Sequence, residues 1–174
     1  MGSPELLVNV AGIGVSATVL DTGDEDWGRV IGTNLTGPFL LTRAVLPLML
    51  DRGFGVIINV ASVAGTVGVR ARAAYSASKA GLIGLTRAVV ADYAADGIRC
   101  IAVYPRTVEA EGSDPIIGSP LEPAHAQETP AARQFDGRVG TPEQVAATIA
   151  FIASPRRPLL HRAAVVVDDG MTAV

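Results

Sequence analysis

The chain has 174 residues, of which 49% are hydrophobic and 18% charged, so it can build a sizeable core and is not intrinsically disordered. Its 14 basic and 17 acidic residues give a net charge of −3, which does not indicate a nucleic-acid surface. No apolar run reaches the roughly 18 residues that span a bilayer, and the single cysteine, Cys100, cannot form an internal disulfide. We therefore expect a cytoplasmic protein that acts neither on nucleic acid nor in a membrane.

The first half of the chain alternates strand and helix patterns. The apolar run at 5–10 predicts a buried strand that ends in a loop. A long helical stretch with an acidic start is predicted over 24–50, and Pro38 and Pro47 should kink it or end it locally. The run GVIINV at 55–60 predicts a second strand, which a loop of small residues follows.

The second half repeats this alternation. A helix is predicted over 73–94, with Gly97 just beyond it as a stop signal. A third strand is predicted at 98–103 and a fourth at 163–167. The helix before the fourth strand should begin at Thr141, whose side chain is a favourable N-cap and is followed by a proline.

Helices that alternate with wholly apolar strands indicate a parallel sheet covered on both faces. We therefore expect an α/β fold, a partial Rossmann-type doubly wound parallel sheet of about four strands with flanking helices. Right-handed crossovers bring the carboxyl ends of the strands to one edge, where such sheets bind ligands. Residues 104–141 have little periodicity, and we interpret them as the loop region around the substrate.

Three side chains near this edge are suited to acid–base chemistry. Tyr75 and Lys79, the only lysine of the chain, are four positions apart and project from one face of the predicted helix. Ser62 lies in the loop after the second strand. An ammonium lowers the pKa of a nearby phenol toward the working range, and a serine hydroxyl can donate to a carbonyl oxygen. A Tyr-x-x-x-Lys pair alone is more often a solvated helix surface, but the combination with Ser62 favours a carbonyl/alcohol redox site.

The motifs around these residues resemble those of the short-chain dehydrogenase/reductase family. The segments that carry the resemblance are Asn9-Val10-Ala11-Gly12, Asn34, Ile58-Asn59-Val60-Ala61-Ser62, Tyr75-Ser76-Ala77-Ser78-Lys79-Ala80, Arg138-Val139-Gly140-Thr141-Pro142-Glu143-Gln144-Val145-Ala146 and Val167-Asp168-Asp169-Gly170. They cover essentially the whole chain from Glu5 onward. The resemblance implies an oxidoreductase that transfers a hydride between NAD or NADP and a ketone or secondary alcohol.

The resemblance also implies roles for single residues. Tyr75 would be the catalytic acid–base, Lys79 would hold the nicotinamide ribose and lower the pKa of the tyrosine, and Ser62 would position the substrate oxygen. Asn34 would complete the catalytic set by holding a water that links the lysine to solvent. The implied cofactor-binding residues are Asn9, Ala11, Gly12, Tyr75, Lys79 and Pro105. No metal site is predicted.

One part of the family pattern is missing. The family's cofactor site begins with a strand, a glycine-rich turn and a helix N-terminus that receives the pyrophosphate, whereas Gly12-x-Gly14 lacks a third glycine at that spacing. We therefore expect residues 1–174 to form a single truncated domain, the catalytic half with the N-terminal strands absent; the alternative is that the missing half is encoded upstream. An uncovered sheet edge invites association. The family commonly pairs through two long helices, here 24–50 and 73–94, so the resemblance implies a homo-oligomer; the alternative is an unstable monomer.

Single positions also depart from the family pattern. Val10 replaces the second asparagine of Asn-Asn-Ala-Gly, and Arg106 replaces the glycine after Pro105. Ala110 stands where a threonine is common, and Asp169 replaces a glycine. Two functions therefore stay open: an enzyme acting on a small-molecule carbonyl or alcohol, and a non-catalytic remnant that has lost cofactor binding and serves as a scaffold or oligomerisation partner.

Overall fold

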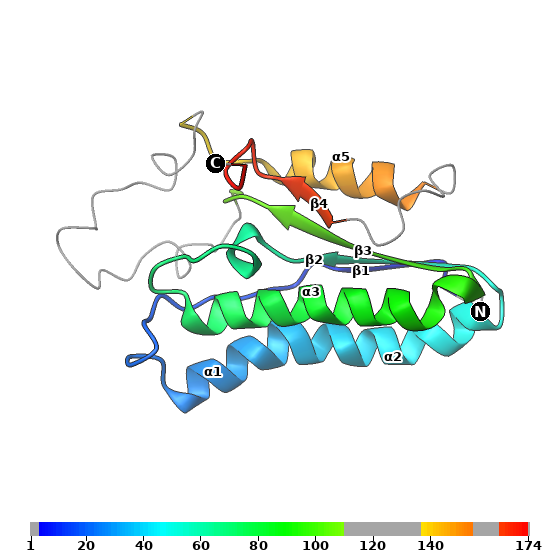
Figure 1. Ribbon diagram of the computed structural model, residues 1–174, viewed down its shortest axis with the longest axis horizontal. Helices are drawn as coiled ribbons and strands as arrows, with labels where there is room; N and C mark the ends of the chain where they lie inside the picture. The colour runs from blue at the N-terminus through cyan, green and yellow to red at the C-terminus, as the bar shows by residue number, and fades with distance from the viewer. Residues whose placement is uncertain (1–3, 110–136, 155–163, 174) are drawn as a thin grey trace.

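Four parallel strands form the centre of the computed structural model, which describes residues 4–109, 137–154 and 164–173 (Figure 1). The strands are β1 (Leu6–Asn9), β2 (Gly55–Val60), β3 (Ile98–Pro105) and β4 (Ala164–Val167). They lie in the spatial order β1-β2-β3-β4, and each neighbouring pair is parallel. The prediction of an α/β fold with a parallel sheet is confirmed.

Helices cover both faces of this sheet. They are α1 (Asp24–Ile31), η1 (Gly32–Thr36), α2 (Gly37–Leu50), η2 (Val63–Gly65), α3 (Ala73–Tyr93), η3 (Ala94–Asp96) and α5 (Pro142–Ala153). Figure 1 shows α2 and α3 on one face and α5 on the other. Ile57 and Cys100 belong to the core on the α3 face, whereas Ile58 and Ile101 pack with Ile152 of α5. Because both faces are covered, β3 is buried at every position and β2 at all but its last, and their apolar residues do not follow a period of two.

The helical stretch predicted over 24–50 consists of three segments. Between α1 and α2 lies η1, a π-helical turn of five residues that contains the buried Asn34. Pro38 lies in the first turn of α2, directly after η1, so its missing N–H removes one hydrogen bond to the preceding turn. Pro47 does not end the helix, since α2 continues to Leu50. The stretch is interrupted by this π-helical turn just before Pro38 and not at Pro47. Such turns are frequent at functional sites.

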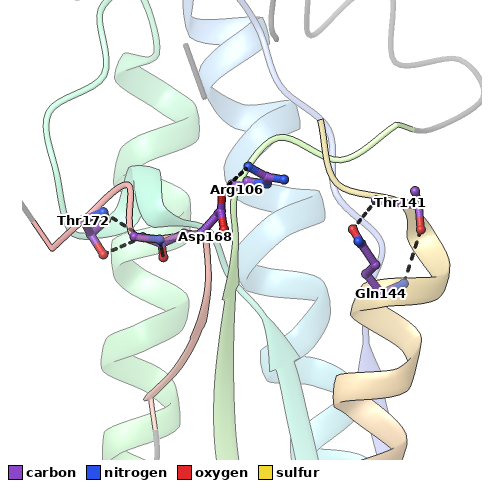
Figure 2. A network of polar contacts seen from close by, with 7 residues as sticks. Arg106, Thr141, Gln144, Asp168 and Thr172 are labelled. Atoms are coloured by element: carbon purple, nitrogen blue, oxygen red, sulfur yellow. Dashed lines mark hydrogen bonds and ion pairs between the residues drawn. The ribbon is translucent and has the colours of Figure 1, made fainter. Parts of the chain in front are cut away.

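Two predicted helix boundaries are confirmed. Gly97 follows η3 with a left-handed φ of 81°, and a Cβ there would collide with the carbonyl oxygen of Gly53, so only glycine fits. Thr141 opens α5 with a capping box (Figure 2). Its hydroxyl accepts from the Gln144 N–H at 3.4 Å, and Gln144 Oε1 accepts from the Thr141 N–H at 2.9 Å.

The loops after β1, β2 and β3 begin together at the carboxyl edge of the sheet, because all strands run in the same direction. This edge therefore brings together segments that are far apart in the chain. Ala110 and most of the loop region predicted at 104–141 lie outside the described residues. Within the described residues, no helix combines the length and apolar character that crossing a bilayer requires.

Candidate active site

The loop after β2 holds Ser62 in a fixed orientation. Ser62 is the N-cap of η2: its Oγ accepts from the Ala64 N–H at 3.2 Å, and its carbonyl accepts from the Gly65 N–H at 3.0 Å. The residue is buried. Because the hydroxyl oxygen already accepts from the backbone, its own hydrogen is available to donate to a neighbouring group.

Helix α3 presents Tyr75 and Lys79 on one side, one turn apart. The Lys79 ammonium lies 5.7 Å from the centroid of the Tyr75 ring and donates to the carbonyl oxygen of Val60, at the end of β2, at 2.8 Å. Lys79 is 3% exposed, and this burial lowers its pKa to about 8. The only lysine of the chain is therefore inside the molecule at the carboxyl edge, not on a solvated helix surface.

Burial raises the pKa of the Tyr75 phenol, and a side-chain hydrogen bond with Ser62 and the positive charge of Arg72 oppose this rise. From the sequence, Lys79 is expected to lower the pKa of this tyrosine. In the structure, the Lys79 ammonium is itself desolvated and donates to Val60 instead. Sequence reasoning missed Arg72, although its position three residues before Tyr75 places it on the same side of the helix start.

Asn34 connects the loop after β1 to helix α3, which carries Tyr75, through hydrogen bonds of its side-chain amide. Its Oδ1 accepts from the Ile13 N–H at 2.9 Å, and its Nδ2 donates to the Ile13 carbonyl at 2.8 Å and to Ser78 Oγ at 2.9 Å. Ser78 Oγ in turn donates to the carbonyl of Tyr75 at 2.7 Å. Both amide hydrogens of Asn34 are thus used within the protein. The water that the resemblance assigns to Asn34 stays a prediction.

The residues expected at the cofactor occupy different environments. Ala11 and Gly12 are exposed in the loop after β1, whereas Pro105 is buried at the end of β3. A Cβ at Gly12 would lie 3.2 Å from Lys79 Nζ, so the absence of a side chain leaves room for the ammonium. Asn9 is buried, and its Nδ2 donates to Asn59 Oδ1 at 2.7 Å. This contact joins β1 to β2, and the cofactor role expected for Asn9 stays a prediction.

A second polar cluster joins the ends of β3 and β4 (Figure 2). The Asp168 carboxylate accepts from the N–H and the hydroxyl of Thr172, at 2.7 and 2.6 Å. Burial raises the pKa of Asp168, but hydrogen bonds from Thr172 and the backbone outweigh it and hold the pKa below its usual value. Arg106 Nη1 lies 3.3 Å from Asp169 Oδ2. Two residues that depart from the family pattern therefore form an ion pair with each other.

Comparisons with known proteins find similar sequences over nearly the whole chain. A family model described as enoyl-(acyl carrier protein) reductase matches residues 1–172. The 2-(S)-hydroxypropyl-CoM dehydrogenase 3 of Xanthobacter autotrophicus (strain ATCC BAA-1158 / Py2) is 41% identical over 175 residues, covering 100% of this chain and 68% of its own length. From the same organism, a protein named inactive 2-(S)-hydroxypropyl-CoM dehydrogenase 2 is 39% identical over 169 residues, covering 97% of this chain and 73% of its own length.

Solved structures show the same fold. A 4-hydroxyisoleucine dehydrogenase complexed with NADH superposes with a TM-score of 0.83 at 31% identity, covering 99% of this chain and 70% of that chain. The chain thus spans about two thirds of the length of the relatives it matches. The similarity to this structure extends over 99% of the chain and thus over its four-stranded sheet.

Proposed function

Because the chain belongs to the short-chain dehydrogenase/reductase family, we propose that it transfers a hydride between NAD(P)(H) and a small-molecule ketone or secondary alcohol, with Tyr75 moving the proton. One observation carries the proposal: the Ser62 hydroxyl, the Tyr75 phenol and the buried Lys79 ammonium converge at the carboxyl edge of the sheet. The names of the relatives support the reaction class, since they include dehydrogenases and a structure complexed with NADH.

The residues at this edge fit the nicotinamide-ribose end of a dinucleotide. Lys79 uses one ammonium hydrogen on the Val60 carbonyl and keeps two further donors. Gly12 presents no side chain in front of this ammonium. We propose that Lys79 and Gly12, with Ala11 and Pro105 beside them, hold NAD or NADP. When bound, the nicotinamide supplies or accepts the hydride.

In carbonyl reduction, Tyr75 Oη gives its proton to the substrate oxygen while the carbonyl carbon gains the hydride, so the product is a secondary alcohol. This direction needs a protonated phenol, which a tyrosine has at neutral pH. Burial raises the pKa of Tyr75 and so weakens it as an acid, while the hydrogen bond with Ser62 and the charge of Arg72 oppose this rise. Ser62 donates its hydroxyl hydrogen to the same substrate oxygen and stabilises the charge that develops there. Alcohol oxidation needs the phenolate of Tyr75, so the rate of oxidation should rise with pH.

The variant Tyr75→Phe tests this role. Loss of the proton donor should lower turnover by about a thousandfold. The ring stays in place because only the Oη atom is removed. Turnover is measured with a panel of ketones and either reduced dinucleotide, and binding of the dinucleotide is measured by fluorescence titration. The thermal unfolding midpoint should match the wild type, and any loss of dinucleotide binding should be small beside the loss of turnover. Undiminished turnover in Tyr75→Phe would show that the role assigned to this residue is wrong.

A second candidate function is a non-catalytic scaffold. The observation that favours it is that a relative with 39% identity is named inactive, and Val10 and Arg106 depart from the family pattern in this chain. Titration of the purified chain with NADH and with NADPH separates the two candidates. Saturable binding in the micromolar range supports the enzyme, and no binding up to millimolar concentration supports the scaffold.

The homo-oligomer expected from the sequence is also a proposal. Phe39, Leu40, Leu41 and Leu48 of α2 are 43–53% exposed, an apolar surface that a second copy would cover. Sedimentation of the purified chain tests this proposal, and a monomer mass would contradict it.

Three further expectations from the sequence are also proposals. They are the single-domain organisation of residues 1–174, the substrate role of loop region 104–141 and the cytoplasmic location.

A further inference from the structure

The turn that carries Ser62 rests on the backbone of α3 at a glycine. A Cβ built on Gly65 would lie 2.9 Å from the carbonyl carbon of Lys79, 3.0 Å from the amide nitrogen of Ala80 and 2.9 Å from Ile83 Cδ1. Two of these three atoms belong to helix backbone, which cannot turn aside as the end of a flexible side chain can. The contact lies on the peptide bond that follows Lys79.

The residues from Ser62 to Thr66 form one hydrogen-bonded turn. Ser62 accepts from the N–H groups of Ala64 and Gly65. The N–H and the hydroxyl of Thr66 both donate to the Val63 carbonyl at 2.8 Å. Because these bonds close the turn from both ends, a displacement at Gly65 moves Ser62 with it.

We propose that Gly65 is a positioning residue that sets the separation between the Ser62 hydroxyl and the Tyr75 phenol by letting the Ser62 turn rest directly on α3. The proposal deepens the proposed function and rests on it. Carbon atoms in van der Waals contact lie about 3.5–4.0 Å apart, so a methyl group at position 65 pushes the turn away from α3 by about half an ångström. A hydrogen bond and an aligned donor both lose effect over such a distance.

The variant Gly65→Ala and its matched control Gly68→Ala test the proposal. Gly68 lies three residues further along the same loop, and a Cβ there would meet nothing within 4 Å. Neither glycine has a positive φ, so alanine adds a methyl group without backbone strain. Gly65→Ala should lower kcat by about tenfold to a hundredfold and leave the KM for the dinucleotide unchanged. Gly68→Ala should change neither, and equal losses in both variants would overturn the proposal.

A double-mutant cycle with Ser62→Ala separates positioning from a general structural effect. If Gly65 acts through Ser62, then Gly65→Ala causes almost no further loss of kcat once the Ser62 hydroxyl is absent. Losses that multiply across the two variants would overturn the proposal. If Gly65→Ala does not fold, the double variant Gly65→Ala/Ile83→Val replaces it in these measurements. Valine lacks the Cδ1 atom, so the new methyl group then contacts only the backbone of α3.

A second measurement needs no turnover. In protein labelled with carbon-13 at the tyrosine ring carbon that bears the oxygen, the Tyr75 resonance is identified by its absence in Tyr75→Phe. Its chemical shift reports the hydrogen bond with Ser62, and Ser62→Ala is the positive control. The resonance should move in Gly65→Ala and stay in Gly68→Ala. If the wild type has no turnover, the proposed function is wrong, but the chemical shift still tests the positioning role of Gly65. An unmoved resonance in Gly65→Ala overturns that role.

Discussion

Replacing Lys79 with methionine tests how the burial of the only lysine changes the free energy of unfolding. Lys79 is 3% exposed, and desolvation lowers its pKa from an ordinary value of 10.5 to about 8. A difference of one pKa unit between the folded and unfolded chains corresponds to about 1.4 kcal/mol, so this difference is worth about 3 kcal/mol. Methionine has a similar shape and length but carries no titrating group.

Proton binding decides the sign of this effect. Between pH 8 and 10.5 the unfolded chain keeps the Lys79 proton that the folded chain has already lost. Raising the pH through this window therefore stabilises the wild type by up to about 3 kcal/mol, and the stabilisation is lost again as the pH falls toward 8. Lys79→Met lacks this pH-dependent term. The loss of the hydrogen bond to Val60 adds a cost that does not depend on pH.

Urea denaturation of both proteins at several pH values from neutral to about pH 10 measures the effect. The unfolding free energy of the wild type should rise relative to that of Lys79→Met across this range. Because Lys79 is the only lysine, carbon-13 labelling of lysine gives one side-chain signal whose titration midpoint reports the pKa directly. Unfolding free energies that stay parallel, within about half a kcal/mol, would refute the reasoning from burial.

The two ends of α5 give the remaining predictions. Arg99→Met should lower the free energy of unfolding by about 2 kcal/mol, as measured by urea denaturation. The Arg99 guanidinium donates to the Ile152 carbonyl at 2.7 Å and to the Ser154 carbonyl at 3.3 Å, at the end of α5. An unchanged free energy would contradict this prediction. Thr141→Ala should cost about 1 kcal/mol by breaking the capping box with Gln144. A lower thermal midpoint measures this loss, and an unchanged midpoint would show that the cap adds nothing.

The strands and helix boundaries could be predicted because their signals are local. Apolar runs mark β2 and β3, Gly97 supplies the left-handed residue after η3, and Thr141 supplies a cap. The π-helical turn η1 could not be predicted, because the spacing of apolar residues does not distinguish one turn of i→i+5 bonding from the α-helix around it. Asn34, a polar residue inside a helical stretch, was the one hint of it.

The candidate site was predictable where it depends on topology. Ser62, Tyr75 and Lys79 come together because parallel strands end at one edge and α3 starts beside it. The direction of the Tyr75 pKa was not predictable, since it depends on how far the phenol is desolvated. Gly65 was missed for a related reason. A close approach between a loop and a helix leaves no trace in the sequence of either one.

Arg106 and Asp169 change how the departures from the family pattern should be weighed. Each of the two residues places a charged side chain where the family usually has a glycine. Considered separately, they are two independent arguments against activity. In the structure the two side chains lie 3.3 Å apart, and that of Arg106 is 10% exposed. The guanidinium is therefore balanced by a carboxylate at the edge of the sheet, and the two departures act as one compensated change. Among the departures within the described residues, Val10, exposed in the loop after β1, then weighs most in favour of a scaffold.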